Sequence, residues 1–142
     1  MGNTLDPGFH GMWNEDIAEG NYGSYPAPRM QRLMIGPNGL VSGMIDATGQ
    51  LLLTAVAIGP DGTCTMIASP PGYSSELTYP GPGRAIWTVK VQGLVVQTFD
   101  ANLAPDGATI NLTARQTLPG LPPNTIVSYF RKVLPAVAGA KG

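Results

Sequence analysis

Residues 84–117, RAIWTVKVQGLVVQTFDANLAPDGATINLTARQT, contain the pattern that decides the fold. Apolar and polar residues alternate along 84–91 and again along 108–117. A period of two places successive side chains on opposite faces of a strand, as in an antiparallel sheet with one buried face. A third apolar segment, 94–103, lies between them, and a glycine-containing turn separates it from each neighbour. The stretch therefore predicts three strands joined by two hairpins.

The same kind of turn recurs along the chain. The turn motifs are Pro37-Asn38-Gly39, Pro60-Asp61-Gly62 and Pro105-Asp106-Gly107, with Thr48-Gly49 and Gln92-Gly93 as shorter turns. Proline sets its φ at about −65° and glycine accepts positive φ, so each motif favours a hairpin loop. The expected strands are 11–17, 29–36, 40–47, 50–58, 63–69, 73–79, 84–91, 94–103, 108–117 and 125–133.

Consecutive hairpins form a meander, and a meander of this length loses its exposed edges when it closes on itself. We therefore predict an all-β chain that forms a single antiparallel up-and-down β-barrel of eight to ten strands. With 142 residues, one domain is expected. Its parts are an N-terminal extension over 1–10, the barrel over 11–134 and a flexible C-terminal tail over 135–142.

Composition limits the possible partners. The chain is 43% hydrophobic and 12% charged, with a net charge of −1 and no run of like charges. This argues against nucleic acid or a membrane surface as a partner. One cysteine and one histidine are too few for a structural zinc site, and we expect no metal and no cofactor. The N-terminus resembles no secretory signal, so a cytoplasmic location is expected.

The segment 51–58 is apolar on both of its faces. Exposed apolar surface is costly in a barrel wall, at about 25 cal/mol per Å². We expect a second copy of the chain to cover the outer face, which predicts a homo-oligomer, in the simplest case a dimer.

Two short motifs lie at the ends of the predicted barrel, Gly11-Met12-Trp13 in the first strand and 128–132, SYFRK, in the last. A Gly-x-Trp opening and a basic residue near the end of the closing strand resemble the calycin superfamily of lipocalins, fatty-acid-binding proteins and avidins. The resemblance implies structural roles for Trp13, which would plug one end of the barrel, and for Arg131, which would pack across its ring. It covers the two ends of the chain and carries over no ligand.

Methionine and aromatic side chains in the predicted strands indicate an apolar pocket. We expect a cavity, with Arg84 as an anchor at its mouth, and the alternative is a core that these side chains fill completely. The lining residues expected are Met30, Met34, Met44, Met66, Trp87, Phe99 and Tyr129.

Three residues are candidates for chemistry. If Trp13 points inward, Glu15 does too, and burial would raise its pKa and suit it to general acid or base catalysis. The alternative is a solvated charge at the rim. Tyr22 and Tyr79 are candidate hydrogen-bond donors to a ligand oxygen, with simple rim packing as the alternative.

The leading hypothesis is a barrel that encloses an apolar or amphipathic small molecule. It would act as a cyclase or isomerase that positions a flexible substrate, and so resembles the barrel enzymes among polyketide-type cyclases. The sequence leaves open a carrier that uses the same pocket without chemistry. It also leaves open a solidly packed structural barrel that makes only subunit contacts.

Overall fold

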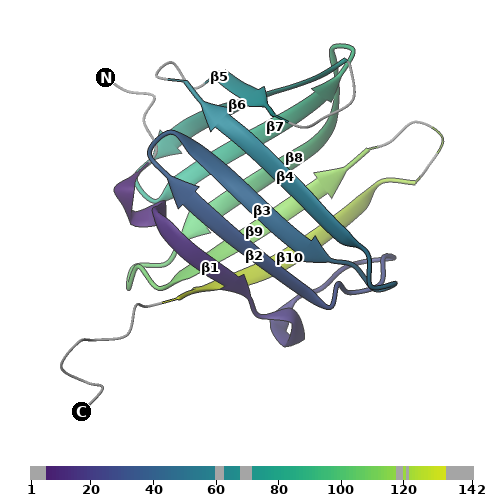
Figure 1. Cartoon of the computed structure of the whole chain (residues 1–142), viewed down its shortest axis with the longest axis horizontal. Coiled ribbons are helices and arrows are strands. Elements are labelled where there is room, and N and C mark those ends of the chain that lie inside the picture. Colours follow the sequence, from purple (N-terminus) through teal and green to yellow (C-terminus); the bar gives the residue numbers. More distant parts are fainter. Residues whose placement is uncertain (1–5, 60–62, 68–71, 118–119, 121, 134–142) are drawn as a thin grey trace.

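The computed structural model describes residues 6–59, 63–67, 72–117, 120 and 122–133. These residues form ten antiparallel strands that close into one up-and-down barrel, in the cyclic order β1-β10-β9-β8-β7-β6-β5-β4-β3-β2 (Figure 1). The strands are β1 Gly11–Glu15, β2 Met30–Gly36, β3 Gly39–Ile45, β4 Leu51–Ile58, β5 Thr63–Met66, β6 Tyr73–Gly81, β7 Arg84–Val91, β8 Leu94–Leu103, β9 Thr109–Gln116 and β10 Asn124–Lys132. Two 3₁₀-helices, η1 (Pro7–Phe9) and η2 (Ile17–Glu19), flank β1. The predicted fold class is confirmed, with the strand number at the upper end of the expected range.

The turns explain why this sequence forms hairpins. Between β7 and β8, Gln92 and Gly93 both have positive φ, 50° and 84°, as in a type I′ turn whose twist matches that of the strands. Between β6 and β7, Pro82 precedes Gly83, which has a φ of 69°. Pro80 lies inside β6, where the register shifts and the ladder does not need its missing N–H. The expected turn 60–62 and tail 135–142 lie outside the described residues.

One end of the barrel is filled by large side chains, and we call it the sealed end. Its buried cluster consists of Phe9, Trp13, Ala85, Ile110 and Phe130. Trp13 is fully buried, and its Nε1 donates a hydrogen bond of 2.9 Å to the carbonyl oxygen of Phe9. These contacts give Trp13 the structural position that was predicted for it.

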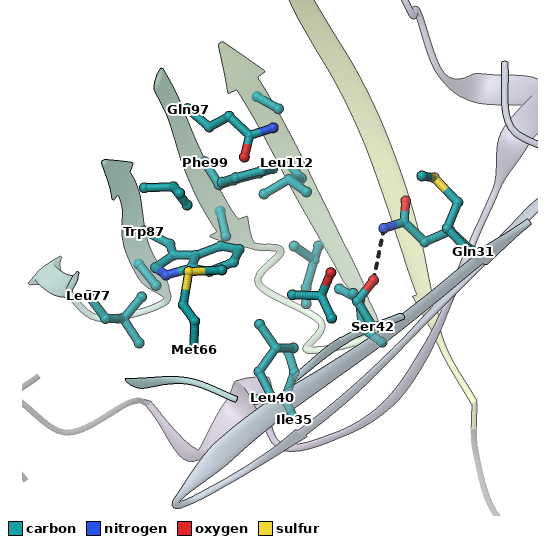
Figure 2. Close-up of a pocket in the computed structure, with 18 of the residues that line it drawn as sticks. Gln31, Ile35, Leu40, Ser42, Met66, Leu77, Trp87, Gln97, Phe99 and Leu112 are labelled. Atoms are coloured by element: carbon teal, nitrogen blue, oxygen red, sulfur yellow. Dashed lines mark hydrogen bonds between the residues drawn. The ribbon is translucent and has the colours of Figure 1, made fainter. Parts of the chain in front are cut away.

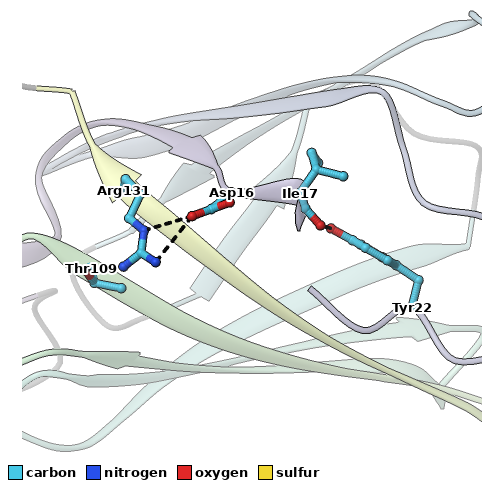
Figure 3. Close-up of polar contacts among 5 residues, drawn as sticks. All are labelled: Asp16, Ile17, Tyr22, Thr109 and Arg131. Atoms are coloured by element: carbon cyan, nitrogen blue, oxygen red, sulfur yellow. Dashed lines mark hydrogen bonds and ion pairs between the residues drawn. The ribbon is translucent and has the colours of Figure 1, made fainter. Parts of the chain in front are cut away.

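The basic residue that packs on Trp13 is Lys132, so the role predicted for Arg131 is wrong. Trp13 and Lys132 are register partners on β1 and β10, and the Lys132 Nζ lies 5.4 Å from the centroid of the Trp13 ring. Arg131 points to the other face of β10, where it bonds Asp16 at 3.3 Å and Thr109 Oγ1 at 3.1 Å (Figure 3). With a period of two, only one of two consecutive residues can reach the barrel interior.

The segment before β1 packs against the barrel. Asp6 accepts hydrogen bonds of 2.8 Å from the backbone N–H of Gly8 and from that of Gly83 in the β6–β7 turn. This places Phe9, which is 2% exposed, inside the end of the barrel. Residues 6–10 of the expected extension are therefore packed on the barrel, and Phe9 among them is part of its core. Among the described residues, no helix has the length and apolar character needed to span a membrane.

Candidate functional site

A cavity of about 480 Å³ lies inside the barrel and is lined by side chains from β2 to β10 together with Phe9. The wall formed by β2, β3 and β4 contributes Ile35 and Leu40, and β8 and β9 contribute Phe99 and Leu112 (Figure 2). A cavity of this size falls in the range of pockets that hold small molecules, about 300–1,000 Å³.

The two ends of the cavity differ among the described residues. Phe9 borders the cavity at the sealed end. At the other end a second hollow of about 350 Å³ lies under the segment that contains Tyr22 and Tyr25, beside the β3–β4 turn. Four residues line both hollows: Gln31, Met44, Gln116 and Ile126. The second hollow therefore adjoins the cavity at this end, and we call it the entrance hollow.

An aromatic pair forms part of the apolar wall. Trp87 on β7 and Phe99 on β8 are register partners, and their rings stack with centroids 5.0 Å apart and an angle of 27° between their planes. Both rings border the cavity, so the wall offers a ring-shaped ligand a broad aromatic surface. Met44 and Met66 line the cavity as well.

Polar side chains occupy two patches on opposite walls. On one wall, Gln31 Nε2 donates a hydrogen bond of 3.2 Å to Ser42 Oγ, and Ser42 is the register partner of Thr54. On the other, Gln97 and Gln116 are register partners on β8 and β9. Figure 2 shows Gln97 across the cavity from Gln31 and Ser42. All these groups are neutral, and each glutamine offers both donors and acceptors.

No acidic, basic or histidine side chain is found among the described residues that line the cavity. Burial of a charge without a partner is expensive, and a charged ligand group would find no partner on these walls. The cavity is therefore suited to an uncharged molecule.

Four of the seven predicted lining residues border the cavity, whereas the other three and the predicted anchor Arg84 do not. The structure brings Met44, Met66, Trp87 and Phe99 together around the cavity. The prediction that Met30 and Met34 line it is wrong. They are 43% and 51% exposed on the outer face, because β2 alternates and places Gln31, Leu33 and Ile35 inside.

Tyr129 and Arg84 also lie away from the cavity. On β10, Tyr129 lies between Ser128 and Phe130, which are both buried. Because side chains alternate along a strand, Tyr129 points away from the barrel interior, and it lines neither hollow. Arg84 forms an exposed ion pair of 2.8 Å with Asp100, whose pKa this hydrogen-bonded guanidinium lowers. The predicted role of Arg84 as an anchor at the mouth is wrong, because its side chain also points away from the barrel interior.

The predicted candidates Glu15 and Tyr22 form a hydrogen-bonded pair. The Tyr22 hydroxyl donates to Glu15 Oε2 at 2.5 Å. It also lies 3.5 Å from the carbonyl oxygen of Ile17 (Figure 3). Burial raises the pKa of Glu15, and the hydroxyls of Tyr22 and Ser128 oppose that shift. Burial and the neighbouring carboxylate raise the pKa of Tyr22. The electrostatics predicted for Glu15 are thus present, but Glu15 lines neither hollow and Tyr22 lines only the entrance hollow.

Tyr79 lies at the sealed end. It packs against the buried cluster there, and its hydroxyl is buried without a hydrogen-bond partner among the described residues. Burial raises its pKa to about 12. Tyr79 lines neither hollow, so the three candidates for chemistry do not converge on the cavity.

The segment over the entrance hollow is held by Asn124, a buried residue at the start of β10. Its Oδ1 accepts hydrogen bonds from the backbone N–H and the hydroxyl of Ser24, at 3.0 and 3.1 Å. Its Nδ2 donates to the carbonyl oxygen of Tyr22 at 3.2 Å. One side chain therefore fixes residues 22–24 to the barrel wall, and we call residues 21–28 the strap.

Sequence reasoning missed the glutamines and Asn124. Gln31, Gln97 and Gln116 occupy inward positions in strands that are otherwise largely apolar inside. The sequence would have indicated these glutamines if the inward face of each strand had been known, because a polar side chain that points into the barrel is turned away from solvent. Asn124 follows two prolines and reads as a loop residue in the sequence.

Among the described residues, no group of three His, Cys, Asp or Glu side chains could hold a metal ion. Comparisons of this chain with models of protein families, with curated proteins and with solved structures give no match.

Proposed function

We propose that this protein binds a neutral apolar or amphipathic small molecule inside its barrel, as a calycin-like binding protein. The observation that carries the proposal is the cavity of about 480 Å³, bordered by Phe9 at the sealed end and adjoining the entrance hollow at the other. Trp13 at the sealed end, with Lys132 over its ring, supports the calycin-like architecture.

A carrier without chemistry is the form of this function that the geometry favours. A cyclase or isomerase needs an acid or base that reaches the ligand. Glu15 and Tyr79 line neither hollow, and Tyr22 reaches only the entrance hollow. A cyclase or isomerase that positions its substrate with the help of one or two polar groups is the second candidate. Turnover of a bound ligand that falls in Glu15→Gln would favour the enzyme over the carrier.

Binding is tested by titration with a neutral apolar fluorescent dye. Leu112→Trp places an indole in the cavity, whereas Met34→Trp places the same group on the outer face. We expect the wild type and Met34→Trp to bind the dye and Leu112→Trp to lose it, with folding of each checked by circular dichroism. Equal binding by all three proteins, or none by the wild type, would refute the proposal.

We further propose that a second copy of the chain covers the outer face of β2, β3 and β4. Exposed apolar residues lie side by side there, because Met34 pairs with Val41 on β3, and Gly43 pairs with Leu53 on β4. The charged residue on this face, Arg32, bonds Asn14 at 2.7 Å. A flat apolar patch of this kind suits a two-fold interface in which each copy presents the same surface.

Light scattering after size-exclusion chromatography tests the dimer. Leu53→Lys places a charge in the centre of the proposed interface, and Leu94→Lys makes the same change at an exposed apolar position on β8. We expect the first variant to be monomeric and the second to remain dimeric. A monomeric wild type would overturn this proposal without affecting ligand binding.

A further inference from the structure

The two ends of the cavity differ in polarity, and this difference indicates the class of ligand. Near the sealed end, Phe9, Ile35 and Leu40 offer only apolar surface. Near the entrance, Gln31 and Gln116 line both hollows, and Gln97 is the register partner of Gln116. A ligand that matches these walls has an apolar body deep in the barrel and a polar group toward the entrance.

The polar group is uncharged. The cavity walls offer amide and hydroxyl groups and no cation that could pair with a carboxylate or phosphate. Asp46 lines the entrance hollow, and hydrogen bonds from Thr48 and from backbone N–H groups lower its pKa. Its carboxylate therefore stays ionised near the entrance and disfavours an anionic ligand group. Arg29 lies against Gly49 in the β3–β4 turn and lines neither hollow.

The aromatic side chains of the wall favour a flat ring as the apolar body of the ligand. Trp87 and Phe99 stack on each other and both border the cavity, and aromatic side chains favour edge-to-face or offset-stacked contact with a further ring. Figure 2 shows Gln97 beside Phe99 on the same strand, so a ring on the aromatic wall would bring a substituent close to the amide.

We propose that the ligand is an uncharged ring compound that carries a carbonyl or hydroxyl group. Its ring lies against Trp87 and Phe99, and its oxygen is hydrogen-bonded to the neighbouring pair Gln97 and Gln116. This inference rests on the binding function proposed above and adds the chemical class of the ligand.

Three probes of similar shape test the inference: acetylnaphthalene, which is a neutral ketone, ethylnaphthalene, which is a hydrocarbon, and naphthoate, which is an anion. Dissociation constants are measured by quenching of tryptophan fluorescence. We expect the ketone to bind about tenfold more tightly than the hydrocarbon, the effect of one good hydrogen bond. We expect the anion to bind more weakly than either.

Variants then test the glutamines. Gln116→Leu and Gln97→Leu should each reduce the affinity for the ketone toward that for the hydrocarbon, and should leave hydrocarbon binding intact as proof of folding. Gln50→Leu is the matched control, because Gln50 is exposed in the β3–β4 turn and lines neither hollow. This control should bind all probes as the wild type does.

The outcomes separate the inference from the proposed function. If no probe binds, the binding function itself fails. If the hydrocarbon or the anion binds as tightly as the ketone, the barrel binds ligands but the assigned ligand class is wrong. If the ketone is preferred and neither leucine variant reduces that preference, the assignment of the polar group to the glutamines is overturned.

Discussion

The sealed end and the entrance end of the barrel are built from the same strands but have different interiors. At the sealed end, Trp13, Phe9 and Phe130 are at most 2% exposed and fill the space between the walls. Toward the entrance, the inward positions carry Gln31, Gln116 and other side chains that border empty space. Closure of the sheet therefore does not determine what fills the barrel. The size of the inward side chains decides whether each part of the barrel, along its axis, is packed core or cavity.

The largest expected effect comes from removing a tryptophan at each end. Trp13→Ala should lower the free energy of unfolding by about 3–5 kcal/mol, as for a fully packed aromatic residue. Trp87→Ala should cost clearly less, because its side chain already borders the cavity. Urea denaturation measures both. Equal losses would mean that the two ends are packed alike.

The next effect concerns the strap over the entrance. Asn124→Ala removes the buried acceptor and donor that hold Ser24 and Tyr22, and should lower the free energy of unfolding by about 1–3 kcal/mol. It should also speed the release of a bound dye, measured by stopped-flow fluorescence. Asn102→Ala on the exposed face of β8 is the control. Unchanged release in Asn124→Ala would contradict an entrance beneath the strap.

A smaller effect is expected at the ring of Trp13. Lys132→Met removes the ammonium from the indole face, a contact worth about 0.5–1 kcal/mol, and should shift the emission of Trp13 in a Trp87→Phe background. Arg131→Met removes a positive charge one residue earlier and should leave that emission unchanged. The reverse result would mean that Arg131, as predicted from the sequence, packs across the ring of Trp13.

The smallest expected effect is a change in pH dependence at Glu15. Burial raises the pKa of this carboxyl in the folded protein above its ordinary value of 4.5. The stability that it contributes is therefore fully present below that value and is lost as the pH rises through the folded pKa. Glu15→Gln should remove this loss, so unfolding at about pH 4 and about pH 7 should show the variant gaining relative to the wild type at the higher pH. An identical pH dependence in both proteins would place Glu15 in solvent.

The fold was largely predictable because turn chemistry is local. Gln92-Gly93 and Pro105-Asp106-Gly107 fix hairpins through the conformations that their own backbones accept, and the strands between them follow. The facing of a strand was predictable only where alternation is clear. Segment 84–91 alternates clearly, and its pattern predicts the inward position of Trp87. In β2 the outer face carries the apolar residues Met30 and Met34, so the sequence pattern wrongly predicts that these two side chains point inward.

The site was less predictable because it depends on contacts between distant parts of the chain. The bond from Asp6 to the β6–β7 turn helps to place Phe9 in the barrel. The strap is held over the entrance hollow by Asn124, which bonds Ser24 from a hundred residues away, and by the pairing of Asn21 with Val127. The inward direction of Glu15 was inferred correctly from Trp13. Its distance from the cavity could not be inferred, because it depends on how β1 sits against β10.

The central claim is that the barrel is hollow between Trp87 and Leu112 and filled at Trp13. A crystal structure determined under xenon tests it most directly, because xenon enters apolar cavities and marks them by its density. We predict xenon beside Trp87 and Phe99 in the wild type, none around Trp13, and none beside Trp87 in Leu112→Trp. A wild-type structure whose side chains fill this space and exclude xenon would contradict the account.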